Sequence, residues 1–120
     1  MILVDTSVWV DHFHRTDEDL RALLLRGEIL THPWVIGELA LGGLSANSEP
    51  GRLLTELPQS SVASHSEVIY AIESRALARR GVGYVDAHLI VAVLLTARAR
   101  LWTRDSKLAA VADELGVAVR

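Results

Sequence analysis

Residues 1–7 of this 120-residue chain read MILVDTS, and they are the best guide to its fold. Ile2, Leu3 and Val4 form a short apolar run that ends at Asp5, as a strand buried on both faces of a parallel sheet would. An acid directly after such a strand is expected at the carboxyl edge of the sheet, where α/β proteins bind their ligands. The segment reaches an acid too early, and lacks the basic start, for a secretory signal peptide.

Strands and helices alternate along the rest of the chain. Short apolar segments predict strands, and amphipathic segments bounded by capping residues, proline or glycine predict helices. The expected strands are 2–4, 28–31, 61–63, 101–103 and 117–119. The expected helices are 17–26, 33–42, a short one before Pro58, 66–80, 86–97 and 106–115. This order predicts an α/β fold, a three-layer sandwich with a central, mainly parallel sheet of four to five strands and helices on both faces.

Length and composition indicate a single domain over residues 1–120, long enough to bury a core. No apolar run approaches the roughly 18 residues of a membrane-spanning helix, so we expect no membrane partner. The absence of cysteine excludes disulfides and thiolate metal sites and favours a cytoplasmic location. Any metal would therefore be held by oxygen or imidazole.

The basic residues are unevenly distributed. A net charge of −3 argues against indiscriminate binding of nucleic acid. However, seven of the twelve basic residues lie within 75–107, and eleven of the twelve are arginine, the side chain best suited to bidentate phosphate contacts. Any one of them alone is expected to lie on a solvated helix face.

Four of the fifteen acids stand out. Asp5 and Asp105 each follow an apolar strand, and a helix cap or turn would explain either one alone. Glu38 and Asp86 are expected on the apolar faces of their helices, where an unpaired carboxylate is costly to bury. An N-cap would also explain Asp86, and a buried ion pair with an arginine would explain Glu38.

Together, the four acids could converge in one crevice at the carboxyl edge of the sheet. Carboxylates that lie so close together repel one another unless a cation binds between them. Clustered oxygen ligands favour Mg²⁺, with Mn²⁺ as a plausible substitute. Such ions activate water and stabilise the transition state of phosphodiester cleavage, so the acids point to a metal-dependent phosphodiesterase.

Four segments resemble the PIN-domain nucleases. They are DTSVWV at 5–10, EL at 38–39, YVDAHLI at 84–90 and LWTRD at 101–105. Their order and the size of the chain are most similar to the VapC toxins of bacterial type II toxin–antitoxin pairs, and the resemblance covers nearly the whole chain.

This resemblance implies a PIN-like fold and a Mg²⁺-dependent endoribonuclease that cleaves RNA. It implies that the catalytic, metal-binding acids are Asp5, Glu38, Asp86 and Asp105. Thr6 and Thr103 match positions where the family often has a hydroxyl that supports the acidic site. The resemblance further implies a homodimer and a cognate VapB-like antitoxin that occludes the site.

Rival functions fit the sequence less well. A receiver-type phosphotransfer domain needs an acceptor aspartate near the middle of the chain, and no aspartate lies between Asp19 and Asp86. A dehalogenase-like phosphatase needs Asp-x-Asp after the first strand, where this chain has Ser7. A catalytically silent PIN-like module that binds protein or RNA remains the alternative from a different class.

The histidines and tryptophans are expected to be structural. The histidines show no metal-ligand spacing, which predicts surface or capping roles for His12, His14, His32, His65 and His88. The tryptophans lie in apolar segments, which favours core packing over stacking on RNA bases for Trp9, Trp34 and Trp102.

Overall fold

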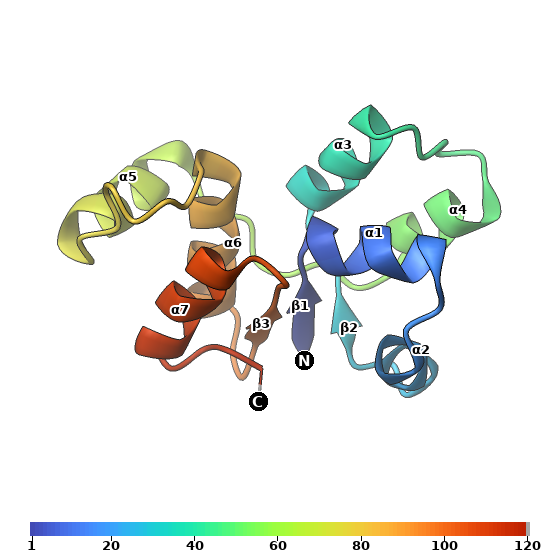
Figure 1. The fold of residues 1–120 in the computed structure, drawn as a ribbon. Coiled ribbons are helices and arrows are strands. Elements are labelled where there is room, and N and C mark those ends of the chain that lie inside the picture. The colour runs from blue at the N-terminus through green and yellow to red at the C-terminus, as the bar shows by residue number, and fades with distance from the viewer. Residues whose placement is uncertain (120) are drawn as a thin grey trace.

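The computed structural model describes residues 1–119, in which strands and helices alternate (Figure 1). Within these residues the strands are β1 (Ile2–Val4), β2 (Ile29–Leu30) and β3 (Arg100–Trp102). The helices are α1 (Thr6–His14), α2 (Glu18–Leu25), α3 (Pro33–Leu41), α4 (Glu49–Glu56), α5 (His65–Ser74), α6 (Tyr84–Leu95) and α7 (Ser106–Glu114). In the view of Figure 1, α5, α6 and α7 lie to the left of the strands, α1 and α3 above β1 and β2, and α2 and α4 to the right.

The sheet is parallel, as the alternation predicts. Its strand order is β2-β1-β3, so the first strand is central. Leu3 pairs with Leu30 on one side and with Leu101 on the other. Because all three strands run the same way, their carboxyl ends meet at one edge.

The prediction of four to five strands is wrong, since the structure forms three strands within residues 1–119. In place of the expected strand 61–63, a single parallel bridge joins Thr31 to Gln59. The chain then leaves the sheet, because the Ser61 amide donates to Thr96 Oγ1 at the end of α6 (2.9 Å). Similarly, the expected strand 117–119 contributes one bridge, between Leu101 and Ala118.

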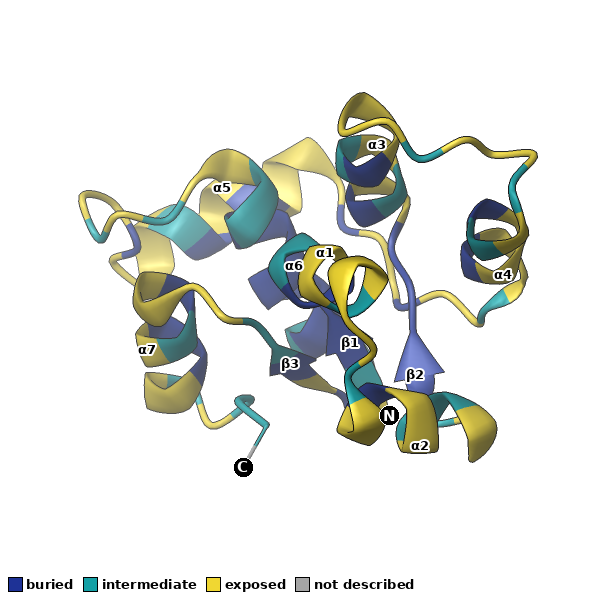
Figure 2. Ribbon diagram, turned by 45° about the vertical axis from the view of Figure 1, so that its right-hand side comes forward, coloured by how far each residue is buried: buried dark blue, intermediate teal, exposed yellow. Residues whose placement is uncertain are grey.

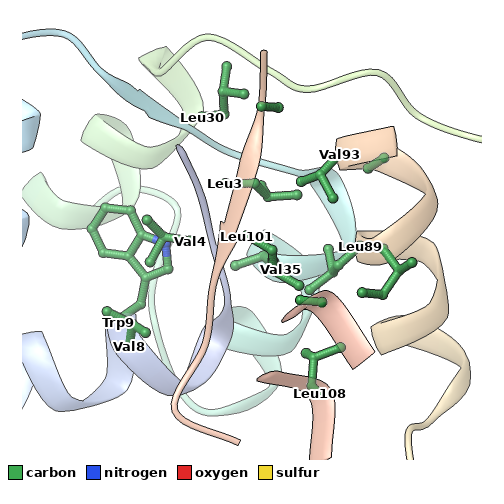
Figure 3. Close-up of a cluster of buried hydrophobic side chains, with 14 of the residues drawn as sticks. Leu3, Val4, Val8, Trp9, Leu30, Val35, Leu89, Val93, Leu101 and Leu108 are labelled. Atoms are coloured by element: carbon green, nitrogen blue, oxygen red, sulfur yellow. The ribbon is translucent and has the colours of Figure 1, made fainter. Parts of the chain in front are cut away.

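Helices cover both faces of the sheet because successive side chains of a strand point to opposite sides. Figure 3 shows Val4 beside Trp9 of α1, whereas Leu3 lies on the side of Val93 of α6. All four are buried in the hydrophobic core. In Figure 2, β2 and most of β1 accordingly have the blue of buried residues, whereas β3 is buried only at its middle residue, and the outer faces of α2 and α7 are yellow.

Several helix ends differ from the predicted ones. α5 ends at Ser74 instead of residue 80, because Ala76 and Arg79 adopt left-handed backbone conformations (φ 51° and 63°) that a helix cannot continue through. α6 begins at Tyr84, two residues earlier than expected. No helix within residues 1–119 is both long enough and apolar enough to cross a membrane.

Helix N-termini surround the carboxyl edge of the sheet. Asp5 directly follows β1 and is the N-cap of α1, a helix whose bounds are not among those predicted from the sequence. Asp105 follows β3 by three residues and is the N-cap of α7. The backbone N–H groups at such termini are partly positive, so this edge suits acidic side chains.

Candidate active site

Asp5 is a buried carboxylate, 6% exposed, at the end of the central strand. Its Oδ1 accepts a hydrogen bond from the Thr6 amide (2.8 Å). Its Oδ2 accepts from Ser7 Oγ (2.9 Å) and from Thr103 Oγ1 (2.7 Å). Three donors compensate the loss of water around the charge and fix the orientation of the carboxylate.

Glu38 is held next to Asp5 by a threonine. Thr6 Oγ1 donates to Glu38 Oε1 at 2.6 Å, which joins α1 to α3. The sequence predicts a buried face of α3 formed by Glu38, Trp34, Val35 and Leu41, and this holds only in part: Val35 is fully buried, whereas Trp34 is 42% and Leu41 91% exposed. The alternative of an ion pair with an arginine is also wrong, because no basic side chain within residues 1–119 pairs with Glu38.

Asp105 joins the same network from the other side. The Asp105 amide donates to Thr103 Oγ1 (3.1 Å), the hydroxyl that also binds Asp5. Asp105 Oδ1 caps α7 by accepting from the amides of Lys107 (2.9 Å) and Leu108 (3.0 Å). The capping interpretation therefore holds for Oδ1. The other oxygen, Oδ2, accepts no hydrogen bond from residues 1–119, and the residue is exposed.

Asp86 lies at the third position of α6, not at its N-cap. Its Oδ2 accepts from the amide of Gly83, the N-cap residue (3.0 Å). Partial burial raises the pKa of the Asp86 carboxyl, and the negative charges of the other three acids raise it further, against the Gly83 hydrogen bond. The charge of Asp86 is therefore close enough to interact with the charges of the other three acids, which come from three other segments of the chain.

The donor set fits a hard divalent cation. All four side chains offer carboxylate oxygens, and none of the four is in an ion pair within residues 1–119. In the same residues, no three acidic or histidine side chains already enclose a metal position. Binding would therefore require side-chain rotations that bring the carboxylates closer together.

Two residues of the site were not among the predicted site residues. Ser7 Oγ donates to Asp5 and accepts the Arg104 amide (3.0 Å). The Arg104 guanidinium bridges Asp11 of α1 (3.1 Å) and Asp17 before α2 (2.5 Å), which holds the segment after β3 against α1. Ser7 could have been found from its hydroxyl beside Asp5, whereas nothing in the sequence pairs Arg104 with two distant acids.

Aromatic side chains between α3 and α6 also differ from expectation. His88 is buried, so its predicted surface or capping role is wrong, and its ring stacks on Trp34 (centroids 4.7 Å apart, 19° between planes). Core packing is confirmed for Trp9, which has no exposed surface, but not for Trp34. His32 does cap α3, because its Nδ1 accepts the Trp34 amide (3.0 Å), although its side chain is fully buried.

Comparison with known proteins assigns the family. The sequence profile of the PIN domain matches residues 2–114, so this chain belongs to the PIN domain family. Two relatives, both named Ribonuclease VapC32, come from the CDC 1551/Oshkosh and H37Rv strains of Mycobacterium tuberculosis. Each is 47% identical over 119 residues, which cover 99% of this chain and 96% of the relative. The resemblance to VapC-type PIN ribonucleases is thereby confirmed.

Proposed function

We propose that this chain is a metal-dependent endoribonuclease of the VapC type, the toxin of a toxin–antitoxin pair. The observation that carries the proposal is the convergence of four acids, none of them in an ion pair, at the carboxyl edge of a PIN-domain sheet. The name of its relatives, Ribonuclease VapC32, supports RNA as the substrate. A phosphodiester bond is a substrate that such a cluster could attack with the help of a cation.

In this proposal Asp5, Glu38, Asp86 and Asp105 are the catalytic acids and hold Mg²⁺, which Mn²⁺ can replace. The bound ion would supply Lewis-acid stabilisation of the phosphate and activation of water. Asp5, oriented by three donors, is the fixed anchor of the site. Thr6 and Thr103 act as positioning residues, because their hydroxyls orient Glu38 and Asp5.

We further propose a cognate VapB-like antitoxin, a homodimeric toxin and a cytoplasmic location. Unpaired carboxylates are suited to a basic side chain of an inhibitor, since a guanidinium can replace the cation and bind them bidentately. Such an inhibitor should compete with Mg²⁺. Equal affinity of the antitoxin with and without saturating Mg²⁺ would contradict this part of the proposal.

The test is RNA cleavage by purified protein, with Asp5→Asn and Asp86→Asn compared with Asp19→Asn. Asp19 is an exposed acid of α2, so the same substitution there should leave cleavage unchanged. We expect both site variants to lose activity by several orders of magnitude while retaining the far-UV circular dichroism of the folded protein. Chelator should abolish wild-type cleavage, and Mg²⁺ or Mn²⁺ should restore it.

Two outcomes would contradict the proposal. Full cleavage in excess chelator would remove the metal mechanism. If the wild type binds RNA but cleaves none with any divalent ion, the alternative of a catalytically silent RNA-binding module holds instead.

A further inference from the structure

Trp34 presents an exposed aromatic ring that is held in a fixed orientation. One face of the ring stacks on buried His88, and Tyr84 contacts its edge (centroids 6.0 Å apart, 75° between planes). Tyr84 also packs edge-on against His88 (4.7 Å, 84°). Because His88 covers one face of Trp34, its exposed surface, 42% of the residue, lies on the opposite face and the rim.

This ring borders a cleft between α3 and α6 that also reaches the acid site. The cleft has a volume of about 600 Å³ and is lined by Pro33, Trp34, Gly37, Glu38, Leu41 and Val85. Glu38 belongs both to the cleft and to the acid site formed by the four acids, and Val85 directly precedes Asp86. The cleft is therefore continuous with the site where the scissile phosphate would be bound.

We infer that this cleft binds a nucleobase of the RNA next to the scissile phosphate, with the base stacked on the free face of Trp34. The inference rests on the proposed endoribonuclease function and adds a substrate subsite to it. Trp34 and Glu38 lie four residues apart on α3, so they project from the same helix face, separated by about 6 Å along the helix axis. That separation suits the base and the phosphate of one nucleotide.

The chemistry of the cleft favours a base. Indole stacks on any base, because every base has a π-face, and single-stranded RNA is commonly bound in this way. The support from His88 and Tyr84 means that the ring needs little ordering when the base arrives. Since Glu38 is the one charged residue among residues 1–119 that lines the cleft, a neutral base fits there better than a phosphate group does.

The test combines removal of the ring with removal of the base. The substrate is a short single-stranded RNA with one mapped cleavage site, compared with copies that carry an abasic nucleotide on either side of that site. The proteins are wild type, Trp34→Ala and Trp34→Phe, with Tyr70→Ala as the control. Tyr70 is 73% exposed on α5 and borders a different cavity, so its loss removes an exposed ring outside the cleft.

We expect one abasic copy to lower the wild-type kcat/KM by about 5- to 150-fold, the range of one stacked base. Trp34→Ala should lose a similar factor on the intact RNA, mainly through KM, and lose little more on that abasic copy. Trp34→Phe should retain most activity, and Tyr70→Ala all of it. If the ring and base effects multiply instead, or if Trp34→Ala cleaves like wild type, the inference is overturned.

Two further measurements test the base-binding cleft independently of the proposed function, and test whether a protein occupies the cleft instead of a base. Should the wild type cleave no RNA, the affinity of Asp5→Asn and of Asp5→Asn/Trp34→Ala for labelled RNA is compared in chelator. Equal affinities would overturn the base-binding cleft, and weaker binding by the double variant would support it. A change in sedimentation mass in Trp34→Ala, together with ring and base effects that multiply, would assign the cleft to a contact between copies and overturn the inference.

Discussion

Neutralising Asp86 should stabilise the metal-free protein. In Asp86→Asn the remaining Oδ1 can still accept the Gly83 amide, and the shape of the side chain is unchanged. The substitution removes a partly buried charge that faces the charges of Asp5, Glu38 and Asp105. Most substitutions destabilise by roughly 1 kcal/mol, so a gain here would be diagnostic of the acid cluster.

The size of the gain follows from the three repulsions. A like charge beyond contact distance costs roughly 0.5–1 kcal/mol at the intermediate dielectric near a protein surface, so three cost about 2 kcal/mol. Loss of a favourable acid at the N-terminus of α6 offsets about 0.5 kcal/mol of this. For a chain of this length a net gain of about 1–2 kcal/mol raises the melting temperature by about 4–10 °C.

The chain offers a matched control in Glu67. It occupies the same third position of α5, where its side chain accepts the Ser64 amide, but it is exposed and its pKa is lowered by its Ser64 hydrogen bonds. Glu67→Gln should therefore melt at or below the wild-type temperature. The two substitutions remove a charge from the same helix position. A rise in melting temperature for Asp86→Asn and a fall for Glu67→Gln would therefore isolate the effect of the four clustered acids.

The assay is thermal unfolding of the three proteins at pH 7, in chelator and in millimolar Mg²⁺. Mg²⁺ should stabilise the wild type more than Asp86→Asn, because an ion that binds the folded state stabilises it by mass action. In chelator the advantage of Asp86→Asn should shrink as the pH falls toward about 4, since the raised pKa of Asp86 lets the folded wild type take up a proton and lose the repulsion. If Asp86→Asn melts lower than wild type in chelator, the reasoning is refuted.

Three further predictions follow from the same contacts. Glu38→Gln should also melt above wild type in chelator and respond less to Mg²⁺; a lower melting temperature with a wild-type response would make Glu38 structural. Thr103→Val removes the hydroxyl that binds Asp5 and should weaken Mg²⁺ binding by about tenfold in calorimetric titration, and an unchanged affinity would deny its positioning role. Burial lowers the pKa of His32 from 6.5 to about 4, so the folded state keeps it neutral where the unfolded chain binds a proton. Stability in urea should therefore fall as the pH drops from 6.5 toward 4, and His32→Asn, which keeps a capping oxygen, should flatten this slope; an equally steep slope would exclude His32 as its source.

The order of the elements and the position of the acids could be predicted because they depend on local features. The apolar run before Asp5 predicts a buried strand and an acid at its carboxyl end, and both are present. The number of strands could not be predicted in this way. Whether residues 61–63 pair with the sheet depends on a competing hydrogen bond from Ser61 to Thr96, 35 residues away in the sequence.

Burial along α3 could not be predicted for a related reason. Trp34 and Leu41 are apolar, and the sequence places Glu38 on the same face, so that face was expected to be buried. In the structure Val35 of that face joins Leu39 in the core, since α3 packs there against α1, whereas Trp34 and Leu41 are exposed. An apolar helix face is thus left open beside the acids, and its composition alone does not reveal this.

The four acids differ in how their charges are compensated, and this difference suggests which of them a cation would relieve most. Asp5 is the most buried, but three donors surround its oxygens. Asp105 has two backbone donors and is exposed to water. Within residues 1–119, Asp86 has one hydrogen-bond donor, partial burial and three negative neighbours, and its pKa is raised. Because a cation stabilises most the anion that its surroundings stabilise least, the favourable contribution of Mg²⁺ should be largest at Asp86, while Asp5 supplies the geometry.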